Sequence, residues 1–252
     1  MRSVYDRIHN ETNQKGGEVR LSQPMAVLSE GIDTDIYQPL SNAGKSDDPF
    51  KREVYDLIKE SFVFLHVGQW GKGKYGQDRK NIGLMIKCFL QAFANQPNPP
   101  ALLLKTNGAD FSILDRVEIE RKIKGEKNKF KGMDSLPNIY LLHGHLTLEE
   151  MALLYNLPKV KAMLSCTHGE GFGRPLAEAT CCDLPVIASA WSGQLDFLNP
   201  KQSVLIDGKL APIPDNLIWE PIIVKPGKWF NVDEGDVIRK LRFFHKNHKQ
   251  VC

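Results

Sequence analysis

The chain has 252 residues, of which 42% are hydrophobic and 25% charged, and its formal net charge is +3 at pH 7. This hydrophobic content suffices for a buried core, and so small a charge, without a basic stripe interleaved with aromatic residues, argues against nucleic-acid binding. The sequence has five cysteines without metal-site spacing, no N-terminal signal region and no apolar run of about 18 residues. We therefore expect a soluble, cytoplasmic protein in a reducing compartment, with one to one and a half domains.

Residues 1–40 are rich in polar and turn-forming residues, and we assign them to an N-terminal segment and a linker. Hydrophobic periodicity then predicts helices over 49–60, 81–95, part of 115–131, 147–155 and 175–183, with a final basic helix from residue 233. Strands are predicted over 24–28, 61–68, 101–105, 138–142, 160–164, 185–188 and 203–206.

Strands that alternate with helices predict an α/β domain over 41–207, with a Rossmann-like parallel sheet, right-handed crossovers and helices on both faces. Residues 208–252 are assigned to a C-terminal tail that ends in the basic helix. Two helix boundaries have a local signal. Thr147 and Glu150 have the spacing of a capping box, and Asp183 tolerates the left-handed backbone at which a helix ends.

The most informative stretch is residues 167–179, which begins just after a predicted strand. Gly171 and Gly173 allow backbone angles that a side chain would forbid, and they let a ligand approach the main chain closely; Pro175 suits the first turn of a helix. Amides there, at a helix start, favour a phosphate or diphosphate. Glu170 and Glu178 can accept hydrogen bonds from sugar hydroxyls. An ordinary glycine-containing turn with solvent-facing glutamates is the alternative.

The string EGFGRPLAEA, followed by CCDLPVIAS and WSGQLDFL, resembles the glycosyltransferase group 1 family (family 4, retaining, GT-B fold). Residues 30–39 are similar to the segment that joins the two domains of that family. Residues 62–68, 79–81 and the helix that ends in 88–93 are similar to the first strand and helix of its donor domain. The resemblance covers residues 24–200, with a weaker echo over 229–241. It implies the donor-binding C-terminal half of a GT-B fold.

The resemblance also implies roles for individual residues. Glu170 would contact the transferred sugar, and Glu178 would hold the ribose hydroxyls of the nucleotide. Lys80 and Arg79 would neutralise the diphosphate leaving group, as fixed cations stabilise charge that develops in a transition state. The remaining donor-binding positions are the amides of Gly171, Phe172 and Gly173, the backbone of Leu142 and His143 at the base, and Gly68 at a strand end, where such sheets bind ligands.

The sequence departs from the family in one way. Gln69 follows Gly68 where the family usually has an arginine, so the diphosphate loses one expected cation. Lys72, Lys74 or Arg79 could replace it. If none does, turnover should suffer more than donor binding.

A donor half implies an acceptor half, and only 23 residues precede Pro24. We therefore expect an isolated donor domain, a fragment, or a subunit that works with a separate acceptor-binding polypeptide. Two other functions stay open: a non-catalytic module that binds a nucleotide sugar, and a P-loop-like nucleotide hydrolase. The second alternative depends on the G-x4-G-K spacing of 68–74, although Tyr75 stands where that motif needs Ser or Thr.

Other motifs fit a structural role better. Asp33 and Asp35 resemble an acidic metal motif but lie among turn-forming residues. The histidines at 143, 145 and 168 have no Glu or Cys at ligand spacing, so we expect no metal and no cofactor beside the nucleotide-sugar substrate. Lysines between 122 and 131 leave a peripheral membrane contact open, although a solvated loop fits their spacing better. The separation of Glu170 from Glu178 does not suit a glycosidase pair.

Overall fold

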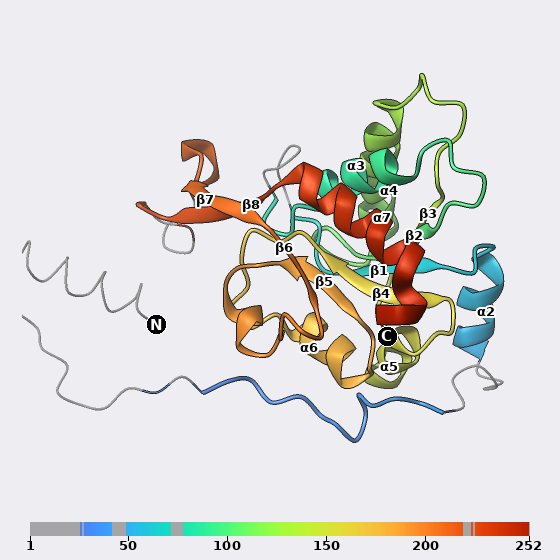
Figure 1. Cartoon of the computed structure of the whole chain (residues 1–252), viewed down its shortest axis with the longest axis horizontal. Coiled ribbons are helices and arrows are strands. Elements are labelled where there is room, and N and C mark those ends of the chain that lie inside the picture. Colours follow the sequence, from blue (N-terminus) through green and yellow to red (C-terminus); the bar gives the residue numbers. More distant parts are fainter. Residues whose placement is uncertain are drawn as a thin grey trace, which may run out of the picture. The chain divides into compact units, whose positions relative to one another are not determined.

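The structure is a computed structural model, and it describes residues 26, 28–41, 49–71, 78–218, 223 and 225–251. The chain divides into two compact units, Met1–Gly31 and Ile32–Cys252. The helices and strands of the described residues all lie in the second unit (Figure 1).

Six strands form one parallel sheet in the order β3-β2-β1-β4-β5-β6. In chain order they are β1 (Val63–Val67), β2 (Ala101–Lys105), β3 (Ile139–Leu142), β4 (Val160–Ser165), β5 (Val186–Ser189) and β6 (Val204–Ile206). The predicted Rossmann-like parallel sheet is confirmed. The strand order reverses between β1 and β4, and ligands of such sheets bind at this reversal, outside the carboxyl ends of the strands.

Helices cover both faces of the sheet (Figure 1). One face packs against α3 (Ile82–Phe93), α4 (Ile113–Asn128) and α7 (Glu234–Val251). The other packs against α2 (Pro49–Leu57), α5 (Leu148–Tyr155) and α6 (Arg174–Cys181). There are also two short 3₁₀ helices. The first, η1 (Gly193–Asp196), lies between β5 and β6, and the second, η2 (Asp215–Leu217), lies between β6 and α7.

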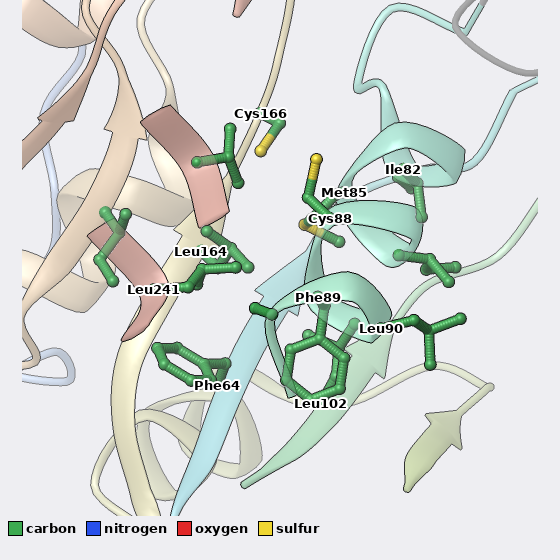
Figure 2. Packing of buried hydrophobic residues seen from close by; sticks show 14 of the residues in the cluster. Phe64, Ile82, Met85, Cys88, Phe89, Leu90, Leu102, Leu164, Cys166 and Leu241 are labelled. Atoms are coloured by element: carbon green, nitrogen blue, oxygen red, sulfur yellow. The ribbon is translucent and has the colours of Figure 1, made fainter. Parts of the chain in front are cut away.

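The first of these faces has an aromatic core centred on β1. Phe64 is fully buried, and its ring lies 5.9 Å from that of Phe93 in α3 and 6.3 Å from that of Phe244 in α7. Figure 2 shows Leu241 of α7 beside Leu164 of β4 in the same cluster. The final helix therefore completes the core around the central strand.

Along the chain, an antiparallel pair of strands follows β6 and precedes α7, and it extends away from the six-stranded sheet (Figure 1). It consists of β7 (Gly208–Pro212) and β8 (Lys228–Val232), which pair from Gly208↔Val232 to Pro212↔Lys228. The sequence predicts no strand in either segment. Phe230 and Val232 of β8 point into the core, and Leu210 of β7 is exposed.

The local signals explain where the helices begin and end. The Thr147 side chain accepts a hydrogen bond from the Glu150 amide, and the Glu150 carboxylate accepts one from the Thr147 amide, so the capping box is confirmed. Asp183 has a φ of 54°, the left-handed conformation expected after α6. The first predicted helix is shorter than expected, since it ends at Leu57. In the predicted strand over 24–28, the described residues 26 and 28 are in no strand, and the others lie outside the described residues.

Candidate functional site

The site lies where β1 and β4 separate. Pairing between them runs from Val63↔Val160 to Leu65↔Met163 and goes no further. Beyond that point His66 bridges the two strands, because its Nδ1 lies 2.8 Å from the carbonyl oxygen of Leu164. Loops that follow the two strands therefore lie together at the reversal of strand order, the place where such sheets bind ligands.

Glu170, in the loop after β4, accepts hydrogen bonds from two cations of the turn before α3. Lys80 Nζ lies 2.8 Å from Oε1 and Arg79 Nη1 lies 2.9 Å from Oε2. The Arg79 carbonyl in turn accepts from the His168 amide at 2.9 Å and from Thr167 Oγ1 at 3.2 Å. Backbone bonds thus tie the two loops together, and the three predicted catalytic residues form one cluster.

Burial makes this cluster electrostatically strong. The side chains of Glu170 and Lys80 are 8% and 12% exposed, whereas that of Arg79 is 50% exposed. Burial alone would raise the pKa of Glu170, but the charges of Lys80 and Arg79 outweigh it and hold that pKa below its ordinary value. Burial also lowers the pKa of Lys80, an effect that Glu170 opposes. The two groups therefore keep each other charged.

The segment before and within η1 holds the glycine loop in place. Ser192 Oγ donates to the Glu170 carbonyl at 2.6 Å and accepts from the Glu170 amide at 3.2 Å, and the Gly193 amide donates to the same carbonyl at 3.1 Å. A Cβ on Gly193 would lie 1.9 Å from the carbonyl oxygen of Gly171. Any residue other than glycine at position 193 would therefore force the glycine loop to move. The sequence analysis used this segment only as part of the resemblance.

The two predicted turn glycines differ in what they need. Gly173 is the N-cap of α6 with a φ of 94°, a conformation that disfavours any side chain. Gly171 has no positive φ, and a Cβ there would meet nothing within 4 Å. The expectation of special backbone angles is therefore right for Gly173 and wrong for Gly171, where open space beside the backbone is the observed property. Phe172, between them, packs on Phe197.

Glu178 lies apart from the Glu170 cluster, on α6. Its carboxylate accepts a hydrogen bond from the Tyr155 hydroxyl at 2.9 Å and one from Arg174 Nε at 2.9 Å. Burial raises its pKa, although these donors oppose the rise. Burial and the neighbouring Glu178 also raise the pKa of Tyr37 to about 12. The side chain of Arg174 is 56% exposed, so this one partner can swing away and free a carboxylate oxygen for a ligand.

Leu142 ends β3, and His143 follows it at the same edge of the sheet. His143 Nε2 lies 2.9 Å from Asp115 Oδ2 at the start of α4. The same carboxylate accepts from the amides of Gly108 and Ala109, both at 2.8 Å, so it orders the loop after β2. Nothing in the sequence singles out Asp115, because it stands at the start of the heavily charged segment 115–131.

The acid dependence of stability tests this role of Asp115. Burial would raise its pKa, but hydrogen bonds from His143, Gly108 and Ala109 outweigh burial and lower the pKa to about 2. A carboxylate with a lowered pKa stabilises the fold above its unfolded pKa and loses that effect as the pH falls. We expect Asp115→Asn to cost about 1–3 kcal/mol at neutral pH, and less and less as the pH falls from about 4 to about 2. Denaturant unfolding of both proteins at several pH values measures this; a constant difference across that range would contradict it.

The structure also bears on the departure at Gln69. The Gln69 amide donates to the Gly108 carbonyl at 2.6 Å, so it serves the same loop as Asp115. Of the three proposed replacement cations, Arg79 lies in the cluster, whereas Lys72 and Lys74 lie outside the described residues, as does Tyr75 of the P-loop alternative.

In the part of the chain that the structure describes, no group of three His, Cys, Asp or Glu side chains is placed to hold a metal ion. His168 instead stacks on Trp229, with ring centroids 4.5 Å apart.

Residues 111–213 match the model of the family described as glycosyl transferases group 1. Over this segment the chain is similar to group 1 glycosyltransferases, and this agrees with the resemblance seen in the sequence. Comparison with curated protein sequences gives no match.

Solved structures of group 1 glycosyltransferases and related enzymes share the fold. A C-terminal domain of the group 1 protein LpcC from Francisella tularensis has a TM-score of 0.54 at 16% identity, over 88% of this chain and 91% of that one. Sucrose-phosphate synthase from Thermosynechococcus elongatus gives 0.57 at 16%, over 96% and 48%. HepE from Anabaena, in complex with UDP and glucose, gives 0.56 at 12%, over 88% and 47%. At such identities the likeness is one of fold, that of a GT-B C-terminal domain, and this chain spans about half the length of the latter two proteins.

A helix that crosses a bilayer needs about 20 consecutive, mostly apolar residues. In the described ranges between residues 26 and 251, none has both the length and the apolar character needed to cross a membrane. On α4, Lys122 donates to the carbonyls of Trp70 and Gly71. That lysine of the charged segment is thus engaged within the fold.

Proposed function

We propose that this chain binds a nucleoside diphosphate sugar at the carboxyl edge of β1 and β4, and that it transfers the sugar with retention to an acceptor held by a further domain or polypeptide. The observation that carries the proposal is the buried Glu170, which accepts from Lys80 and Arg79 beside a glycine loop. HepE, which has this fold, was solved with UDP and glucose. The group 1 family match supports a transferase.

Different residues would contact the base, the ribose and the diphosphate of the donor. Leu142 and His143, at the end of β3, would line the base, and Glu178 would accept hydrogen bonds from ribose hydroxyls once Arg174 moves aside. Amides of Gly171, Phe172 and Gly173 would lie along the diphosphate. Gly68 would let the donor approach the end of β1, and because it has no side chain, His66 and Lys80 can lie against its α-carbon.

Transfer breaks the bond between the anomeric carbon of the sugar and the oxygen of the terminal phosphate. The electron pair stays with the diphosphate, which therefore gains negative charge as the bond breaks. Lys80 and Arg79 stabilise that charge, since fixed cations in a water-poor site need no reorganisation at the moment of reaction. Glu170 holds both cations before the donor arrives, and it then accepts from a hydroxyl of the sugar. No metal ion is needed in this scheme.

A non-catalytic donor-binding module is the second candidate, and one observation favours it. Gln69 stands in place of a usual cation, and its amide is used by the Gly108 carbonyl. Titration of the chain with UDP-, GDP- and ADP-sugars in the absence of Mg²⁺ tests binding. Transfer to an acceptor, or slow donor hydrolysis, separates an enzyme from a module. Failure of every donor to bind without Mg²⁺ would overturn both candidates.

The ribose assignment has a sharper test. We expect Glu178→Gln to weaken donor binding by roughly 1–3 kcal/mol, the usual cost of a lost charged hydrogen bond. Tyr155→Phe is the matched control, because it removes the hydroxyl that donates to Glu178 but keeps the carboxylate. It should lower stability and leave donor affinity near that of the parent. Equal affinities of Glu178→Gln and the parent chain would show that ribose binds elsewhere.

A further inference from the structure

A buried histidine lies next to the catalytic cluster and has one ring nitrogen without a partner. His66, in β1, has no solvent-exposed surface. Its Nδ1 must carry a proton, because the Leu164 carbonyl at 2.8 Å can only accept. In the neutral ring Nε2 then has a lone pair, and it has no hydrogen-bond partner among the described residues. Burial lowers the pKa of His66 to about 4, so the ring is neutral at physiological pH.

The side chain of Lys80 lies near this ring, and its charge helps to lower the pKa of His66. The position that a Cβ of Gly68 would take lies 3.1 Å from His66 Nε2 and 3.3 Å from Lys80 Cε. The imidazole and the lysine stem thus both border the bare α-carbon of Gly68. The ammonium group, one bond beyond Cε, is bonded to Glu170 at 2.8 Å. A buried acceptor without a donor therefore stands beside the best-buried cation of the site.

Donor binding changes what Lys80 needs, and this step rests on the proposed function. The ammonium group has three donors. When a sugar hydroxyl engages Glu170 and the diphosphate enters, Lys80 must reorient while it stays in a buried place. A buried ammonium that loses an acceptor loses stability as a charged group.

We infer that His66 is a positioning residue for Lys80: in the donor-bound state its Nε2 accepts one hydrogen bond from the ammonium group and directs another N–H at the diphosphate. Nδ1 anchors the ring on β4 while Nε2 holds the cation. Gly68 lacks a side chain so that the two groups can meet. His66 acts through Lys80 and does not itself touch the donor.

The two ring nitrogens can be tested separately. The amide nitrogen of asparagine can replace Nδ1, and the end of a glutamine side chain can replace Nε2. His66→Asn keeps the bond to Leu164 and loses the acceptor for Lys80, whereas His66→Gln keeps an acceptor oxygen within reach of Lys80. A purely structural role, as a bridge between β1 and β4, would make the asparagine variant the milder of the two.

The experiment measures nucleoside diphosphate affinity by calorimetry for these variants, starting with whichever of UDP, GDP and ADP the parent chain binds. We expect His66→Asn to bind about tenfold more weakly, and His66→Gln to bind within about threefold of the parent. As the pH rises, the affinity of His66→Asn should begin to fall at a lower pH than that of the parent chain. The reason is that a lost acceptor lowers the pKa of the bound ammonium group, which then loses its charge earlier. In a Lys80→Ala background, His66→Asn should have no further effect.

Each outcome decides something. Parent-like affinity of His66→Asn, or an equal loss in the Lys80→Ala background, would overturn the inference and leave the proposed function standing. Absence of nucleoside diphosphate binding by the parent chain would overturn the proposed function itself. If a His66 variant does not fold, Gly68→Ala is the substitute, because its methyl group would press on both His66 Nε2 and Lys80. It should weaken diphosphate binding, and parent-like affinity would count against the inference.

Discussion

Replacement of Lys80 by alanine is expected to lower the turnover number by roughly 10²–10³-fold, the usual loss when one donor to a developing negative charge is removed. Lys80 is the better buried of the two cations on Glu170, and a charge interaction is stronger where water is excluded. The effect should fall on turnover more than on donor affinity, because the diphosphate gains charge only as the bond breaks. Steady-state rates of transfer or of donor hydrolysis measure it.

Arg79→Ala is the matched control for this prediction. Its side chain bonds to the same carboxylate but is 50% exposed, so water can replace part of its effect. We expect a smaller loss of turnover than for Lys80→Ala. A larger loss for Arg79→Ala would mean that the exposed cation, one of the three candidates to replace the missing arginine, stabilises the leaving group instead.

Gly193→Ala is expected to abolish measurable donor binding and to lower the free energy of unfolding by about 1–3 kcal/mol. The added methyl group would stand 1.9 Å from the Gly171 carbonyl oxygen and 3.0 Å from that of Glu170. The glycine loop would have to move, and the hydrogen bonds from Gly193 and Ser192 to Glu170 would break. Chemical denaturation and donor titration measure the two effects.

The control is the same substitution on the other side of that contact. A Cβ on Gly171 would meet nothing within 4 Å, and the residue has no positive φ. Gly171→Ala should therefore unfold like the parent chain, whatever it does to the approach of a ligand. If Gly193→Ala binds donor normally, the loop geometry at Glu170 does not matter to the site.

The sequence predicts well what local chemistry decides. The capping box at Thr147 and the left-handed residue Asp183 set helix boundaries within a few residues. The contact between Glu170 and Lys80 could also be predicted. Lys80 lies between β1 and α3, Glu170 lies in the loop after β4, and the carboxyl ends of these parallel strands are at the same edge of the sheet. Roles at the donor itself stay predictions.

What the sequence could not predict depends on contacts between distant segments. His66 lies among apolar strand residues and looks like part of the core in the sequence. Its position became informative only when the structure showed that the pairing of β1 with β4 ends just before it. Asp115 belongs to a helix whose charges look solvated, yet a loop from β2 folds back onto it. β7 ends at Pro212, and proline is disfavoured in strands, so its pairing with β8 across a long connection leaves little local trace.

The packing of α7 over β1 has a consequence for biosynthesis. Phe64 lies in β1, whereas Phe244 and Leu241, which help to enclose it, lie in α7 and are translated only after all six strands of the sheet. Until then the nascent chain exposes one side of its central strand, a state prone to aggregation. Completion of this core must therefore wait until α7 has been translated, and a ribosome that stalls before this helix would release a polypeptide with one face of its sheet exposed.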